Sequence, residues 1–175
     1  MAGLWLGTNA MDLRAQTQAP GFVDFGKIEE IAGGSTVDIH LKGPLLGMAA
    51  KIVEKSEAEA GALLRSLKLV RINVFKLDEG NRAEVQKRIK EVRTNLEAEK
   101  WEQIVSVREK NEDVGVYIKT RGEDSIEGLV VTVLDGKKEA VFINIVGDLK
   151  PEQLAMVADK LNIDPLKKAS GKIRK

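Results

Sequence analysis

The chain contains no cysteine and a single histidine, His40, among its 175 residues. Without cysteine, one chain cannot form a thiolate nucleophile or a structural zinc site, and one histidine is too few for a histidine-rich metal centre. A serine–histidine–acid triad could use only His40. We therefore expect no metal site, although the absence of cysteine suits both the cytoplasm and the periplasm.

Other residue types and patterns are also scarce. Aromatic residues make up 4% of the chain, which disfavours a glycosidase cleft lined by aromatic platforms. The 28 basic and 27 acidic residues leave a net charge of +1, so there is no strong positive field to hold a nucleic acid. No apolar run approaches about 18 residues, so no membrane-spanning helix is expected.

The strongest pattern in the chain is a hairpin at residues 126–149. Two β-branched apolar runs flank an Asp135-Gly136 turn, a sequence typical of short hairpins. Both runs are apolar on both faces, whereas a strand with one wet face alternates with polar residues. We therefore expect these strands in the middle of a sheet that helices or a second protein cover on both sides. The residues that alternate between the two faces are Val130, Val131, Val133 and Leu134.

The remaining periodicity predicts an α+β fold. Alternating residues predict further strands at 36–41, 69–75, 101–107 and 114–118, and helical spacing predicts helices at 44–53, from 56, at 81–99 and from 151. This order gives a mainly antiparallel sheet with a four-strand C-terminal meander and helices packed on it. Within the strand at 36–41, Val37, Ile39 and Leu41 should form the buried side.

Three local features refine the predicted helices. An apolar stripe of Leu45, Met48, Ala49, Ile52 and Val53 marks the helix after Pro44. Ser56-Glu-Ala-Glu59 has the pattern of a capping box, so a new helix should start there. In the longest helix, we expect a solvated face that includes Lys87, Lys90 and Arg93.

The predicted domain spans residues 21–163, between two segments of a different character. Residues 1–20 resemble a flexible lead-in, a remnant of a signal peptide or of cloning, and lack a convincing signal-peptide pattern. Residues 164–175 form a basic tail, with five basic residues and no acid from Leu166 onward, which we expect to be disordered.

Several segments together resemble the bacterial family described as domain of unknown function 4252. The resemblance covers about residues 21–163 and implies a small α+β domain, secreted to the periplasm or carried as a lipoprotein, with no assigned catalytic residues. This chain has no lipobox cysteine. The segments that carry the resemblance are Phe22-Val-Asp-Phe-Gly-Lys-Ile-Glu, Val37-Asp-Ile-His-Leu-Lys-Gly-Pro, Trp101-Glu, Asp113-Val-Gly-Val-Tyr-Ile-Lys, Gly128-Leu-Val-Val-Thr-Val and Glu139-Ala-Val-Phe-Ile-Asn-Ile-Val-Gly-Asp-Leu.

His40 and Asp38 are the candidate catalytic pair. Histidine titrates near neutral pH, and a nearby carboxylate can orient it as a general acid or base. However, residues two apart share one face of any strand, so their proximity follows from the strand itself. The same residues on a solvated strand face are the simpler interpretation.

Thr132, Asn144 and Tyr117 are the candidate ligand-binding residues. Thr132 and Asn144 interrupt the apolar hairpin, and buried polar groups need hydrogen-bond partners. They could line a small polar pocket with Tyr117, or they could bond across strands as part of the sheet. A third candidate is anion or lipid binding by the helix start at residues 43–47 and the basic tail.

These observations favour a non-catalytic protein-binding or regulatory module of the bacterial cell envelope. The alternatives are a small-ligand or hydrolytic enzyme using His40 with Asp38, and a weak anion or lipid binder. No cofactor is expected. The expected partner is a protein or a second copy of the chain, contacted through a face of the sheet.

Overall fold

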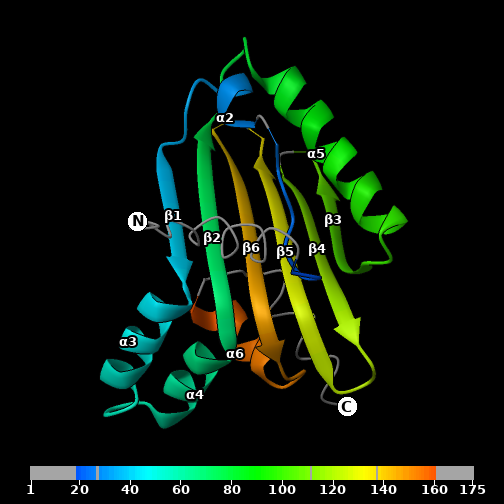
Figure 1. The fold of residues 1–175 in the computed structure, drawn as a ribbon. Helices are drawn as coiled ribbons and strands as arrows, with labels where there is room; N and C mark the ends of the chain where they lie inside the picture. The colour runs from blue at the N-terminus through cyan, green and yellow to red at the C-terminus, as the bar shows by residue number, and fades with distance from the viewer. Residues whose placement is uncertain (1–18, 27, 111, 137, 161–175) are drawn as a thin grey trace, which may run out of the picture.

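The computed structural model describes residues 19–26, 28–110, 112–136 and 138–160 of the chain (Figure 1). Its helices are α2 (Ile28–Ile31), α3 (Gly43–Val53), α4 (Ala58–Ser66), α5 (Arg82–Ala98) and α6 (Gln153–Lys160). Its strands are β1 (Val37–Lys42), β2 (Leu67–Lys76), β3 (Glu102–Glu109), β4 (Glu112–Arg121), β5 (Ser125–Asp135) and β6 (Glu139–Leu149).

The strands form one six-stranded antiparallel sheet in the order β1-β2-β6-β5-β4-β3. The last four strands of the chain form a meander, in which each strand pairs with the next along the sequence (Figure 1). Strands β5 and β6 lie at the centre of the sheet, where their two-sided apolar runs are buried. The predicted α+β class, antiparallel sheet and four-strand meander are confirmed.

Helices cover both faces of the sheet. One face, which we call the α5 face, packs against α2, α5 and the segment at residues 23–25. The opposite face, which we call the α6 face, packs against α3, α4 and α6. The strand residues of the α5 face include Phe75, Tyr117, Val130 and Phe142. Those of the α6 face include Val70, Val116, Val131 and Ile145.

The α5 face has an aromatic centre. The ring of Phe142 lies 5.2 Å from that of Phe25 and 5.8 Å from that of Phe75, measured between centroids. Tilted and edge-on pairs of this kind add to the free energy gained by burial. The apolar stripe predicted for α5 also faces this centre, with Val85, Ile89, Val92 and Leu96 all buried.

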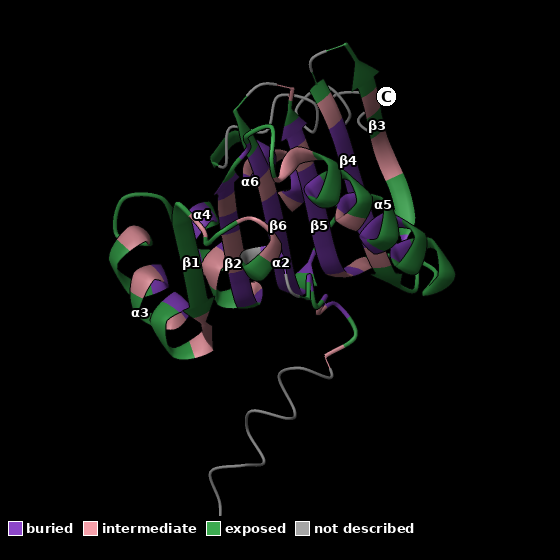
Figure 2. Cartoon of the chain, turned by 90° about the horizontal axis from the view of Figure 1, so that it is seen from above, coloured by how far each residue is buried: buried purple, intermediate pink, exposed green. Residues whose placement is uncertain are grey.

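Strand β1 departs from its prediction. Val37, Ile39 and Leu41 were expected to be buried, but 41%, 37% and 36% of their surfaces are exposed. The reason is the position of β1 at the edge of the sheet, where the described helices cover it less completely than they cover the central strands. Figure 2 shows β1 exposed along its length, whereas β5 and β6 are largely buried.

The helix starts follow the sequence only in part. Helix α3 contains Pro44 in its first turn, as predicted. A new helix does start after Ser56, but the prediction that Ser56 caps it is wrong. The N-cap of α4 is Glu57, and the Ser56 hydroxyl donates a hydrogen bond to the Val53 carbonyl instead. Helix α5 begins at Arg82, close to the predicted start at residue 81. The residue before it, Asn81, is the N-cap, and its side chain bonds to the backbone of Asp78 and Lys76 instead of to the helix.

The two terminal predictions fall outside this description. Residues 1–18 and 161–175 are not described, so the flexible lead-in and the basic tail stay predictions. Within the described residues, no helix combines the length and the apolar character needed to cross a bilayer.

Candidate binding surface

The strands carry three continuous rows of aliphatic side chains across the α6 face. Strand registers place directly paired residues side by side on the same face, so each row can be followed from strand to strand. The first row is Val37, Val74, Val141, Val133, Val114 and Val107, and the second is Ile39, Ile72, Ile143, Val131, Val116 and Val105. The third row is Leu41, Val70, Ile145, Leu129 and Ile118.

These rows reach solvent at one edge of the sheet. Among the residues that the structure describes, every exposed large apolar side chain lies on β1 or α3. In α3, Leu46 and Ala50 are buried, and the predicted stripe partly turns outward. Leu45, Met48 and Ile52 expose 53%, 62% and 72% of their surfaces. We call the exposed side chains of Val37, Ile39, Leu41, Leu45, Met48 and Ile52 the β1–α3 surface.

An apolar cavity of about 390 Å³ lies beside this surface. Ile39 and Leu41 of β1 form part of its wall, together with side chains of α3, α4 and β2. Its only charged lining residues are Glu57 and Lys160, whose side chains form a 2.6 Å ion pair. The other lining residues are Leu46, Val53, Ala60, Leu63, Leu64, Leu67, Val70, Ile72, Ile145 and Val157. Of the β1–α3 surface, only Ile39 and Leu41 line this cavity, so the surface and the cavity meet at β1. An exposed apolar surface beside an apolar cavity is typical of a site for an apolar partner.

The candidate catalytic pair lies on the other side of β1. Asp38 and His40 are both exposed, and alternation along the strand turns them away from Ile39, Leu41 and the cavity. The Asn73 amide donates a 3.0 Å hydrogen bond to Asp38. Partial burial lowers the pKa of His40, and the charges of Lys42 and Arg71 lower it further, while Asp38 raises it. This environment favours neutral imidazole, and acid–base chemistry by the pair stays a prediction.

Thr132 belongs to a buried polar contact with α5. The Arg93 guanidinium donates to the Thr132 hydroxyl through Nε at 3.1 Å and Nη2 at 2.9 Å, and to Asp113 through Nη1 at 2.7 Å. The expectation that Arg93 lies on a solvated face is therefore wrong, since only 7% of its surface is exposed. Gly115 leaves room for this contact, because a Cβ there would lie 3.0 Å from Arg93 Nε.

Asn144 fixes the N-terminal part of the described chain to the sheet. Its side-chain oxygen accepts a 3.0 Å bond from the Val23 amide, and its nitrogen donates a 2.9 Å bond to the Gly21 carbonyl. Gly21 is packed so closely that a Cβ would lie 2.0 Å from the Glu127 carbonyl oxygen. Asn144 thus joins residues 123 positions apart in sequence.

Tyr117 lies on the same face but has its own partner. Its hydroxyl accepts a 2.9 Å hydrogen bond from Gln103. Burial raises the pKa of this hydroxyl, although the nearby charge of Arg93 acts in the opposite direction. Thr132, Asn144 and Tyr117 therefore each bond to a different part of the protein, and all three are buried. A ligand at these residues stays a prediction that this arrangement does not favour.

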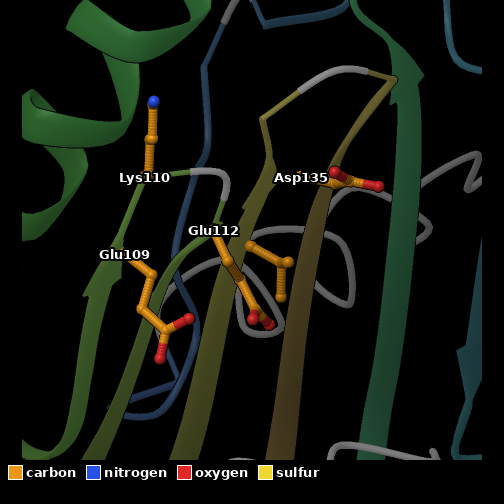
Figure 3. Close-up of a pocket in the computed structure, with 5 residues that line it drawn as sticks. Glu109, Lys110, Glu112 and Asp135 are labelled. Atoms are coloured by element: carbon orange, nitrogen blue, oxygen red, sulfur yellow. The ribbon is translucent and has the colours of Figure 1, made fainter.

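A second hollow, of about 510 Å³, lies where the turn between β3 and β4 meets the end of β5. It is lined by Glu109, Lys110, Glu112, Val133 and Asp135. In Figure 3 the Lys110 side chain points away from the carboxylates of Glu109 and Glu112, and the Asp135 carboxylate points elsewhere. Within the described ranges, no acidic or histidine cluster could hold a metal ion. Four of the five residues that line the hollow are charged, so we interpret the hollow as a solvated surface at the ends of these strands.

The fold and this surface define a class of protein: a small α+β domain with one antiparallel sheet and an exposed apolar surface at one sheet edge. The chain belongs to the family described as domain of unknown function DUF4252, whose model matches residues 32–157. That match spans the sheet from β1 to β6 and most of α6. Comparison with curated proteins and with solved structures gives no match.

The sequence pattern does not mark the β1–α3 surface as a candidate site. The spacing of Leu45, Met48 and Ile52 is that of an amphipathic helix, and the same spacing serves a core or a partner. The signal available in the sequence is that the strand predicted at 36–41 is followed directly by the apolar helix at 44–53. Their exposure depends on strand order, which the sequence pattern does not specify.

Proposed function

We propose that this protein is a non-catalytic module that binds another protein through the β1–α3 surface. The observation that supports this proposal is the gathering of all the exposed large apolar side chains of the described residues on two adjacent elements. Scattered surface leucines are ordinary, whereas a contiguous exposed apolar patch marks an interaction site. Because α3 and β1 are adjacent in the chain, one partner could contact both.

The cavity beside the surface gives the partner an anchoring point. Binding energy at protein interfaces concentrates where a few apolar side chains enter a well-packed pocket. The lining is apolar apart from Glu57 and Lys160, and these two charges largely neutralise each other. A partner segment with one or two large aliphatic or aromatic side chains therefore fits this chemistry better than a charged or sugar-like ligand does.

The proposal includes a location in the bacterial cell envelope. Its support is the resemblance of the chain to a family whose members are secreted to the periplasm or carried as lipoproteins. Fractionation of cells that express the native gene would test this part. Recovery of the protein in the cytoplasmic fraction, with periplasmic and membrane fractions empty, would contradict the location and leave the binding surface in place.

A double variant tests the binding function. Met48→Glu with Ile52→Glu places two charges on exposed positions of α3, while Lys87→Glu with Lys90→Glu changes two exposed positions of α5. We expect a protein from an envelope extract to be retained by the wild type and the α5 variant and to be lost with the α3 variant. The purified partner should then bind with a Kd at least about tenfold weaker for the α3 variant in calorimetry. Equal binding by all three proteins would overturn the proposal.

A further inference from the structure

The two edges of the sheet differ in how open they are to another strand. Strand β3 at one edge has an irregular register between Gln103 and Val105, and such irregularities are a common protection against edge pairing. Strand β1 at the other edge pairs with β2 in an unbroken register over six residues. It contains no proline or glycine. Among the described residues no strand pairs with the side of β1 that faces away from β2, so this side presents a regular row of backbone donors and acceptors.

The side chains of β1 are arranged in a self-complementary order. On one side of the strand, His40 lies midway between Asp38 and Lys42. On the other side, Ile39 and Leu41 are at equal distances from His40 along the chain. In an antiparallel pair of copies centred on His40, Asp38 of each copy would therefore lie opposite Lys42 of the other. Ile39 of each copy would lie opposite Leu41 of the other.

We propose that β1 pairs with β1 of a second copy across a two-fold axis at His40, joining two sheets into one of twelve strands. This inference goes beyond the proposed function and does not depend on it. The pairing satisfies the free backbone groups of the edge, and it covers part of the exposed surface of Ile39 and Leu41. The aliphatic rows of the α6 face would then continue from one copy into the other.

Charge decides the direction and the register of this pairing. Cross-strand pairs of opposite charge stabilise a sheet, whereas like charges directly opposite each other destabilise it. A parallel arrangement in register would place Asp38 beside Asp38 and Lys42 beside Lys42, so it is disfavoured. The amide of Asn73, which lies opposite Asp38 on β2, donates a hydrogen bond to the Asp38 carboxylate and keeps it on the same face of the sheet as Asn73. Arg71 of β2 lies opposite His40 on the inner side.

The expected dimer is modest in strength. A stable interface usually buries more than about 1,000 Å², and the five residues of each β1 that would pair, Asp38–Lys42, supply only a part of that area. Helix α3 begins where β1 ends. Its exposed side chains Leu45, Met48 and Ile52 can add apolar contacts at the two ends of the β1–β1 interface. We therefore expect an equilibrium between monomer and dimer that depends on protein concentration.

A charge exchange tests the pairing and its register. Asp38→Lys alone creates two Lys–Lys pairs, and Lys42→Asp alone creates two Asp–Asp pairs. We expect each single change to raise the Kd of the dimer about tenfold or more. The double variant Asp38→Lys with Lys42→Asp restores opposite charges, so its Kd should return close to the wild-type value in sedimentation velocity. A wild type that stays monomeric at about 1 mM, or a double variant as weak as the singles, would overturn the proposal.

The absence of cysteine allows a second test that does not depend on charge. In His40→Cys, the two new thiols would lie on the axis, with Cα atoms about 4.5–5.5 Å apart, a separation that a disulfide can bridge. In the matched control Val37→Cys, the thiols would lie six residues out of step, about 20 Å apart. Mild oxidation should yield a covalent dimer of the first variant and not of the second. The reverse result, or no covalent dimer of either, would contradict the pairing.

Discussion

The two faces of the sheet are held by different kinds of contact. The α5 face combines an aromatic centre with buried polar anchors, in which Arg93 bonds to Thr132 and Asn144 bonds to Val23. The α6 face is built almost entirely from rows of valine, isoleucine and leucine. Buried polar bonds demand a specific arrangement, whereas aliphatic contacts tolerate changes of partner. The α5 face is therefore fixed by specific polar bonds, whereas the α6 face extends into the exposed β1–α3 surface, through which we propose that a partner binds.

The difference is greatest at the edge of the sheet. On the α5 face, residues 21–25 and α5 close over the central strands, and Asn144 fixes that cover through two hydrogen bonds. On the α6 face, the aliphatic rows run on to β1, where their last members are exposed. The α5 face is therefore covered over the central strands, whereas the apolar rows of the α6 face reach solvent at the β1 edge.

Phe142→Ala should have the largest effect on stability. Phe142 is fully buried and contacts two other aromatic rings, so we expect a loss of about 3–5 kcal/mol in the free energy of unfolding, measured in urea. The control is Val141→Ala, which changes the adjacent residue on the half-buried α6 face. Its loss should be about 1–2 kcal/mol. Equal losses would remove the difference between the faces.

Arg93→Ala should cost somewhat less. The substitution removes three charge-assisted hydrogen bonds and leaves the Thr132 hydroxyl without its donor, so we expect a loss of about 2–4 kcal/mol in the free energy of unfolding. Lys90→Ala, an exposed position one turn earlier, should change it by less than about 0.5 kcal/mol. If both variants unfold at the same urea concentration, Arg93 is not an anchor.

Much of the central sheet could be predicted from the sequence, because its signal is local. Strands β5 and β6 carry apolar residues on both sides, and this pattern correctly places them in the middle. The burial of Arg93 was harder to predict, because a charged side chain is usually exposed to solvent. Yet it lies four residues after Ile89 and three before Leu96, within the buried stripe of α5. Its partners Thr132 and Asp113 come from strands that only the folded sheet brings together.

The candidate sites were less predictable for a physical reason. Asn144 was recognised as a polar interruption, but its partners Gly21 and Val23 are more than 120 residues away. The exposure of β1 depends on its position beside β2 alone, and strand order is a property of the whole chain. The spacing that marks an apolar strand or helix is the same for a core and for a binding surface.

Asn144→Ala should act mainly on one segment. Loss of the two hydrogen bonds to residues 21–23 should cost about 2 kcal/mol and release that segment before the sheet unfolds. Hydrogen exchange can measure this directly: we expect faster exchange of the Val23 amide and unchanged exchange of amides in β4. A uniform increase across the sheet would show instead that Asn144 supports the whole core.

The smallest effect on the α5 face should come from the ionisation of Tyr117. Its pKa is raised above the ordinary value of 10.0, so the folded state disfavours the phenolate. The contribution of the protonated Tyr117 hydroxyl to the free energy of unfolding is therefore complete below pH 10, and it is lost as the pH rises through the pKa of Tyr117 in the folded protein. Urea unfolding from pH 9 upward should show a decline that Tyr117→Phe reduces. An identical decline in both proteins would assign it to other groups.

The most direct test of the difference between the faces is the stability of the variant Met48→Glu with Ile52→Glu. If the β1–α3 surface is a binding surface, charges at these exposed positions should change the free energy of unfolding by no more than about 0.5 kcal/mol per site while partner binding is lost. A loss of about 3 kcal/mol or more would show that α3 packs these side chains into the core. That result would contradict the assignment of this edge as the functional surface.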